Sequence, residues 1–177
     1  MNNIEVEIRS FLTKDKYDEL IDYFKQNAKQ VKDDYQETFY FDCEEDLRIQ
    51  KNNYYAKVWM KKGKLHDDHR EEIEIKFEKE QFDELEKLFL ALKYDIEIKW
   101  FRKRLQFEWE DITVCLDDTK GFGYVIELEK MCTEENKEEE YNKLKTKLEE
   151  LNVNISSKEE FKEKFEYYKN NWRELTK

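Results

Sequence analysis

The chain has 177 residues, of which 44% are charged, and its formal net charge is −11. Its 12 Phe, 11 Tyr and 4 Trp exclude a disordered chain, and the negative charge argues against general nucleic-acid binding, which relies on positive fields. The length favours one domain over residues 1–177, and with no Pro and only three Gly there is no obvious linker.

The cysteines and the hydropathy indicate a compartment. Cys43, Cys115 and Cys132 are an odd number without metal-ligand spacing, so we expect free thiols in a reducing environment. No apolar run is long enough to span a membrane, and the N-terminus lacks the regions of a signal peptide. The sequence therefore predicts a cytoplasmic protein with no membrane partner, as a monomer or a homodimer.

The first part of the chain predicts a strand followed by a helix. Residues 4–12 alternate apolar and ionisable side chains, and Thr13 can then cap a helix. The apolar stripe of that helix is Tyr17, Leu20, Ile21 and Phe24. Further strands are predicted at about 36–42, 45–50, 54–62 and 70–78.

Two connections are predicted between these strands. Asn52-Asn53 is a plausible tight turn, and residues 63–68 form a polar loop in which we expect His66 to be exposed, like His69 beside it. The strand at 70–78 leads into a second helix. Its apolar stripe is Phe82, Leu85, Leu88, Phe89 and Leu92.

The second half predicts three more strands and two helices. The strands are at about 97–109, 112–118 and 123–131, the first two joined at Glu110-Asp111. The third helix has the stripe Tyr141, Leu144, Leu148 and Leu151. The fourth starts at a capping box, Ser157 to Glu160, and has the stripe Phe161, Phe165, Tyr168 and Trp172. We interpret this last stripe as core; the alternative is a lid at a cavity mouth or a dimer contact.

The pattern Glu-x-Glu occurs three times, each time on an alternating strand that runs into a helix. The copies are Glu5-Val-Glu7-Ile-Arg9, Glu72-Ile-Glu74-Ile-Lys76 and Glu127-Leu-Glu129. Residues two apart in a strand share a face, so each pair directs two carboxylates to the same side. The first two copies and the helices after them repeat one unit, which suggests two related halves of a closed sheet.

The ionisable strand faces must point either to solvent or into a barrel interior. Bases gather on the middle strands, at Arg48, Lys57, Lys61, Arg102 and Arg104. An interior with bases on some walls and carboxylates on others suits a polyphosphate bridged by divalent metals. Because the candidate ligands are all oxygen, Mg²⁺ or Mn²⁺ is expected and a Zn²⁺ site is not.

Six motifs, in order, resemble the CYTH superfamily, the triphosphate tunnel metalloenzymes that include class IV adenylate cyclases and thiamine triphosphatases. They are Glu5-Val-Glu7-Ile-Arg9, Gln36-Glu-Thr-Phe-Tyr40-Phe41, Leu47-Arg48-Ile49-Gln50, Arg70-Glu-Glu72-Ile-Glu74, Arg102-Lys-Arg104-Leu-Gln-Phe107 and Asp117-Asp118-Thr-Lys-Gly121-Phe-Gly123-Tyr-Val-Ile-Glu127-Leu-Glu129. The resemblance implies an α+β fold: an eight-stranded antiparallel β-barrel tunnel with flanking amphipathic helices. The tunnel core would cover about 4–131 and the C-terminal helices about 134–175.

The resemblance also implies site residues. The metal ligands would be Glu5, Glu7, Glu127 and Glu129, with Glu74 or Asp117 as additions, although Asp117 and Asp118 are equally typical of a turn. The phosphate-binding residues would be Arg9, Arg48, Lys57, Lys61, Lys76, Arg102 and Arg104, with Lys57 and Lys61 competing for one family position. We expect Gly121 and Gly123 to serve the backbone rather than to hold phosphate, since no helix N-terminus follows them.

Three departures bear on catalysis. Arg9 stands where the family has Lys, Gln50 where it has Arg, and Thr38 where it has Asp. Arginine stays protonated and cannot accept a proton, so a general base would be Lys76, Lys57 or Lys61, unless a metal activates the attacking water.

The leading hypothesis is a divalent-metal-dependent hydrolase of inorganic, nucleoside or thiamine triphosphate. The alternatives are a class IV adenylate cyclase that makes cyclic AMP from ATP and a non-catalytic nucleotide- or polyphosphate-binding protein.

Overall fold

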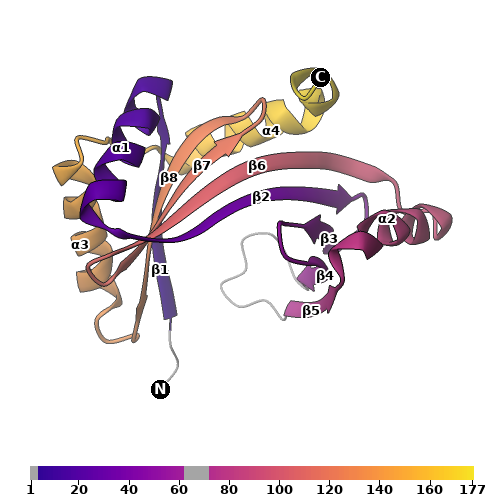
Figure 1. Cartoon of the computed structure of the whole chain (residues 1–177), viewed down its shortest axis with the longest axis horizontal. Coiled ribbons are helices and arrows are strands. Elements are labelled where there is room, and N and C mark those ends of the chain that lie inside the picture. The colour runs from indigo at the N-terminus through magenta and orange to yellow at the C-terminus, as the bar shows by residue number, and fades with distance from the viewer. Residues whose placement is uncertain (1–3, 62–71) are drawn as a thin grey trace. The chain divides into compact units, whose positions relative to one another are not determined.

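The computed structural model describes residues 4–61 and 72–177 and contains an α+β fold (Figure 1). Its elements in chain order are β1 (Ile4–Leu12), α1 (Lys14–Asn27), β2 (Lys29–Phe41), β3 (Asp46–Lys51), β4 (Ala56–Lys61), β5 (Glu72–Phe77), a 3₁₀ turn (Lys79–Gln81), α2 (Phe82–Ala91), β6 (Ile96–Trp109), β7 (Ile112–Thr119), β8 (Gly123–Cys132), α3 (Lys137–Glu150) and α4 (Lys158–Leu175). No helix in the described ranges is both long enough and apolar enough to cross a membrane.

The eight strands form one antiparallel sheet in the order β1-β8-β7-β6-β2-β3-β4-β5. This confirms the predicted α+β class and its eight antiparallel strands. The order has two ends, β1 and β5, and within the described ranges no pairing joins them. The closed sheet that the duplicated unit suggested is therefore not formed by hydrogen bonding between these edge strands.

The internal contacts divide the chain into two compact units. Unit 1 comprises Met1–Asp33 and Lys103–Tyr167, and unit 2 comprises Asp34–Arg102 and Tyr168–Lys177. β2, β6 and α4 each contribute residues to both units.

In unit 1, α1 and α3 cover one face of the strands (Figure 1). Thr13 caps α1 as predicted, its Oγ1 accepting a hydrogen bond from the Lys16 amide at 3.2 Å. The alternating apolar residues of β1, β6, β7 and β8 pack against these helices. Members of this core include Val6, Ile8, Tyr17, Leu20, Phe24, Leu105, Phe107, Val114, Leu116, Ile126, Leu128, Leu144 and Leu148.

In unit 2, α2 covers the strands through a smaller core. Its buried members are Phe39, Phe41, Ile49, Ala56, Phe82 and Leu85. The residues of α4 that belong to this unit are tied to β6 by two hydrogen bonds to its backbone. Tyr168 Oη donates to the Lys99 carbonyl and Trp172 Nε1 to the Glu97 carbonyl, each at 2.8 Å. The predicted core role of Tyr168 and Trp172 is confirmed, since both are buried.

Two predicted helix stripes were partly wrong. Leu88 and Leu92 are 53% and 58% exposed, because the ten-residue α2 makes its core contacts through Phe82, Leu85 and the half-buried Phe89. On α3, Tyr141 is 38% exposed, whereas Leu144 and Leu148 lie in the core.

Two predicted boundaries also differ from the structure. β2 begins at Lys29 rather than near residue 36, in a stretch with little apolar alternation. The predicted tight turn at Asn52-Asn53 is a four-residue connection, in which Asn52 Oδ1 accepts hydrogen bonds from the Tyr54 and Tyr55 amides. Of the predicted capping box, the bond to Ser157 is present, with the Glu160 amide donating to Ser157 Oγ at 3.0 Å. The predicted polar loop with His66 and His69 lies outside the described residues.

Candidate functional site

In unit 1, α1 and α3 cover one face of the strands, and the ionisable side chains lie on the opposite face. On β1, Val6 and Ile8 point into the core, so Glu5, Glu7 and Arg9 share the other face. The antiparallel register sets Glu7 opposite Glu129 and Arg9 opposite Glu127. The predicted sharing of one side by the two carboxylates of a pair is therefore met for the first pair, and the register places the third pair on the same face of the sheet.

The Glu carboxylates of this face are crowded. Burial, a hydrogen bond with Glu127 and the charge of Glu127 together raise the pKa of Glu129 to about 9. Partial desolvation, followed by the Glu127 charge, also raises the pKa of Glu7. Carboxyl groups that resist ionisation in this way are short of positive charge, which a divalent cation would supply.

Arg104 is the base built into the same face. Its Nε and Nη2 donate to the two carboxylate oxygens of Asp117 at 2.8 and 2.7 Å, and Nη2 lies 3.6 Å from Glu127 Oε2. Burial opposes the charge of Arg104, but the Asp117 bonds more than offset this and hold the guanidinium pKa above its usual value. These two hydrogen bonds to Asp117 fix the plane of the Arg104 guanidinium beside the carboxylates.

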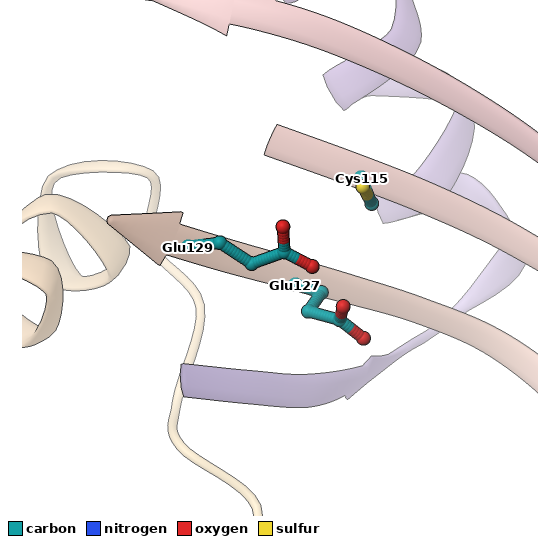
Figure 2. Close-up of side chains that lie close together, drawn as sticks. All are labelled: Cys115, Glu127 and Glu129. Carbon is teal, nitrogen blue, oxygen red and sulfur yellow. The ribbon is translucent and has the colours of Figure 1, made fainter. Parts of the chain in front are cut away.

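A third kind of side chain, which the sequence interpretation missed, joins the acidic cluster. Ligand atoms of Cys115, Glu127 and Glu129 all lie within 4.8 Å of one another (Figure 2). The sequence carried part of the signal, because alternation along the strand puts Cys115 on the face of Asp117; the β7–β8 register, which the structure provides, sets it opposite Glu127. Linear cysteine spacing could not show it, because the ligands come from two strands.

In unit 2 the face opposite α2 carries the bases. On β3, Ile49 points into the core, so Asp46, Arg48 and Gln50 share the other face. Arg48 donates from Nε and Nη2 to the two oxygens of Asp46 at 2.5 and 2.6 Å. Its guanidinium also lies 4.3 Å from the Tyr40 ring centroid and 5.4 Å from that of Trp59.

Glu74, from the second Glu-x-Glu copy, lies among these bases. Lys57 Nζ is 2.6 Å from Glu74 Oε2 and 4.5 Å from the Trp59 ring centroid, and Lys76 Nζ is 3.5 Å from Glu74 Oε1. The Lys57 hydrogen bond, opposed by desolvation, lowers the pKa of Glu74. Lys61 pairs through its backbone with Asp46 and Glu72, and its side chain is not among those described.

Arg102 is held by a polar chain within unit 2. Its Nε and Nη2 donate to Gln36 Oε1 at 3.0 and 2.5 Å, and Gln36 Nε2 donates to Asp34 Oδ2 at 3.0 Å. Asp34 Oδ1 in turn accepts a hydrogen bond from the Asn53 amide. This series of hydrogen bonds links Arg102 to the β3–β4 connection and restricts the orientation of its guanidinium.

The chain was compared with known protein families. The family model described as CYTH domain matches residues 3–165, more than half of the chain. The chain belongs to the CYTH family. This confirms the resemblance that the six motifs indicated. No curated protein sequence matches the chain.

Solved structures share this CYTH fold at low sequence identity. A Pyrococcus horikoshii protein is 24% identical with a TM-score of 0.67, covering 86% of this chain and 92% of its own. A Hippeastrum protein, described as a candidate adenylyl cyclase with a dominant triphosphatase activity, is 20% identical with a TM-score of 0.62, covering 88% and 93%. A Vibrio parahaemolyticus protein described as a candidate adenylate cyclase is 17% identical with a TM-score of 0.62, covering 88% and 95%.

Membership in the CYTH family supports a triphosphate-related activity, and this family depends on metal in general. The predicted residues of this CYTH chain fall into two sets. Unit 1 brings together Glu7, Arg104, Asp117, Glu127 and Glu129, with Glu5 and Arg9 on the same face of β1. Unit 2 brings together Arg48, Lys57, Glu74 and Lys76 on β3 to β5, and Arg102 on its part of β6.

Asp118 and the two glycines lie apart from both sets. The side chain of Asp118 alternates with that of Asp117 and shares the strand face of Leu116. Gly121 and Gly123 have φ values of 77° and 120°, a backbone region that favours glycine, as expected for the β7–β8 connection.

Proposed function

We propose that this chain is a divalent-metal-dependent hydrolase of triphosphate substrates. The observation that carries the proposal is the carboxylate cluster of Glu7, Glu127 and Glu129. Its members share one face of the sheet, and burial, together with the hydrogen bond to Glu127 and the charge of Glu127, raises the pKa of Glu129 to about 9. A solvated face of independent carboxylates would not have this property.

The donor set fits Mg²⁺ or Mn²⁺. Glu5, Glu7, Glu127 and Glu129 offer carboxylate oxygens from neighbouring strands, and these are the ligands that hard divalent cations prefer. When bound, such a cation neutralises phosphate oxygens and makes the phosphorus more electrophilic. Asp117 is already engaged by Arg104 through both oxygens, so we assign it to the positioning of that base.

The arginines and lysines would bind the phosphate oxygens. Arg48 and Arg104 suit this role because each guanidinium is fixed by a bidentate hydrogen bond to a carboxylate and stays protonated. Arg9, Lys57, Lys61, Lys76 and Arg102 complete the set that we propose. During attack by water on the terminal phosphorus, these arginine and lysine side chains would stabilise the negative charge that develops on the phosphate oxygens.

The proton of the attacking water needs an acceptor, which Arg9 cannot be. Of the two candidate lysines whose side chains are described, Lys76 has the more exposed side chain, at 59% against 17% for Lys57, and the longer contact with Glu74. We therefore place Lys76 first among the candidate bases, with Lys57 and Lys61 as alternatives.

A product assay tests the proposal. Tripolyphosphate, ATP and thiamine triphosphate are incubated in parallel with Mg²⁺ or Mn²⁺, and phosphate, pyrophosphate and cyclic AMP are quantified. We expect phosphate release that requires metal. Pyrophosphate with cyclic AMP from ATP would instead identify an adenylate cyclase, and tight binding without turnover under either metal would identify a non-catalytic binder.

A pair of variants separates the cluster from the rest of the acidic surface. Glu127→Gln removes one charge from the cluster, and Glu149→Gln makes the same change on an exposed position of α3. We expect Glu127→Gln to lose metal-dependent phosphate release by about 100-fold or more, the range for a lost preorganised electrostatic group, and Glu149→Gln to keep it. Full activity in both variants would contradict the assignment.

A further inference from the structure

Cys115 has no role in the proposed hydrolysis, yet its thiol lies beside the acidic cluster. The side chain is 1% exposed. It lies on β7 between Val114 and Leu116, which are both core residues, so it points to the opposite, ionisable face. Among the described residues no hydrogen bond is formed by its Sγ, and oxygens of Glu127 and Glu129 are its neighbours (Figure 2).

We propose that Cys115, Glu127 and Glu129 form a mixed sulfur–oxygen subsite for a thiophilic divalent cation, with Zn²⁺, Co²⁺ and Cd²⁺ as the expected class. One ligand atom from each residue lies within 4.8 Å of the other two. Ligand atoms around one tetrahedral ion with sulfur and oxygen bonds lie about 3.5 Å apart, so rotation of the two flexible Glu side chains would close the site. The backbone already provides the register, with Cys115 directly opposite Glu127.

The chemistry of sulfur gives the subsite its selectivity. A thiol is a poor ligand for Mg²⁺, which prefers oxygen, whereas borderline and soft cations bind thiolate strongly. On binding, the S–H bond of Cys115 breaks, its electron pair forms the sulfur–metal bond, and its proton leaves to solvent. No oxidant or reductant is required.

The inference deepens the proposed function, because two of the three ligands are also proposed Mg²⁺ ligands. A thiophilic cation that occupies Glu127 and Glu129 withdraws them from Mg²⁺. We therefore expect Zn²⁺ to oppose Mg²⁺-dependent turnover, and to do so less in a variant without the thiol.

Cobalt binding tests the subsite without any measurement of turnover. The reduced protein is titrated with Co²⁺ under nitrogen, and the near-ultraviolet absorbance is followed for a thiolate-to-cobalt charge-transfer band. We expect the band in the wild type and its loss in Cys115→Ser, with a Co²⁺ affinity that falls by at least about tenfold when a ligand is removed. Cys43→Ser and Cys132→Ala remove the other two thiols and should keep the band.

The outcomes are decisive in both directions. No band in the wild type, or a band that survives Cys115→Ser, would overturn the proposal. If Cys115→Ser fails to fold, Glu129→Gln serves in its place: it should keep the band but bind Co²⁺ more weakly, and an unchanged affinity would count against the site. A protein that shows the band but hydrolyses no triphosphate would refute only the proposed function.

Discussion

At the scale of single residues, the raised pKa of Glu129 is the most informative physical property of the site. Its carboxyl group keeps a proton at a pH where a solvated glutamate would be ionised, because burial and Glu127 both disfavour a second negative charge. Residues with strongly shifted pKa values gather at functional sites, since structural surfaces seldom retain such a cost. From the raised pKa of Glu129 we predict how the stability of the metal-free protein depends on pH.

The stability of the metal-free protein should fall as the pH rises from about 4.5 to about 9. Over this interval the unfolded chain has released the Glu129 proton while the folded protein still holds it. Because the unfolded state binds fewer protons, the free energy of unfolding falls as the pH rises. Thermal unfolding in the presence of a chelator, at a series of pH values, measures the slope. Glu129→Gln has no such proton and should give a flatter profile; equal slopes for the two proteins would contradict the assignment.

Asp117 offers a second test at this scale, because a metal ligand and a holder of Arg104 behave differently. The side chain of Asp117 is 6% exposed and both of its oxygens are bonded to Arg104, so in the proposed function Asp117 would act on substrate through the guanidinium. We expect Asp117→Asn to raise KM for a triphosphate by about tenfold, the effect of losing roughly 1.4 kcal/mol of binding. The affinity for Mn²⁺ should stay the same.

The neighbouring Asp118→Asn is the matched control, since Asp118 points to the other face of β7 and should leave both quantities unchanged. A large loss of Mn²⁺ affinity in Asp117→Asn would return Asp117 to the metal ligands.

At the scale of elements, sequence periodicity predicted strands better than helix faces. The alternation in β1 and β8 fixes which side chains share a face, and only the register was needed to set Glu7 opposite Glu129. In α2, the same apolar spacing predicted burial at Leu88 and Leu92, which are exposed. Periodicity reports that one face is apolar, but the extent of the covering surface decides how much of that face is buried.

The candidate site was predictable to the extent that its residues follow one another in a strand. The Glu-x-Glu pairs were found because their spacing is local. The bidentate contact between Arg104 and Asp117 and the proximity of Cys115 to Glu127 depend on pairing between strands. Residue spacing along one strand does not encode this pairing. The division of the ionisable residues between two compact units likewise depends on long-range contacts.

Within unit 1, the first part of α4 contacts the ionisable face of β1. Phe161 stacks on Phe11 with ring centroids 4.2 Å apart, and the Arg9 guanidinium lies 4.8 Å from the Phe161 ring centroid. Ser10, which is fully buried, accepts a hydrogen bond from the Ser156 amide at 3.0 Å and so fixes the chain just before α4. The helix therefore contributes to the placement of a proposed phosphate-binding residue.

Phe161→Ala should reduce both stability and substrate affinity. Loss of the ring stack from a half-buried position should cost about 1–2 kcal/mol of unfolding free energy, measured by urea denaturation. KM for triphosphate should rise because Arg9 loses its support, while Mn²⁺ affinity is unchanged. Tyr167→Ala, at a position of α4 that is 62% exposed, is the control, and an equal effect of both changes would contradict the role of Phe161.

At the scale of the whole molecule, the net charge of −11 opposes the binding of a polyanion. A triphosphate can bind only where fixed bases and metal together outweigh this field. The proposed function therefore requires that triphosphate affinity depend on a divalent cation and on bases such as Arg48. This requirement is independent of the rate of the chemical step.

The most direct test of the central claim is a calorimetric titration with a non-hydrolysable imido analogue of tripolyphosphate, with and without Mg²⁺. The proteins are the wild type, Glu127→Gln from unit 1, and Arg48→Gln from unit 2. We predict binding that is strengthened by Mg²⁺ in the wild type, that loses this metal dependence in Glu127→Gln, and that is weakened with and without Mg²⁺ in Arg48→Gln. Binding that is indifferent to Mg²⁺ and to both substitutions, or no binding at all, would contradict the account.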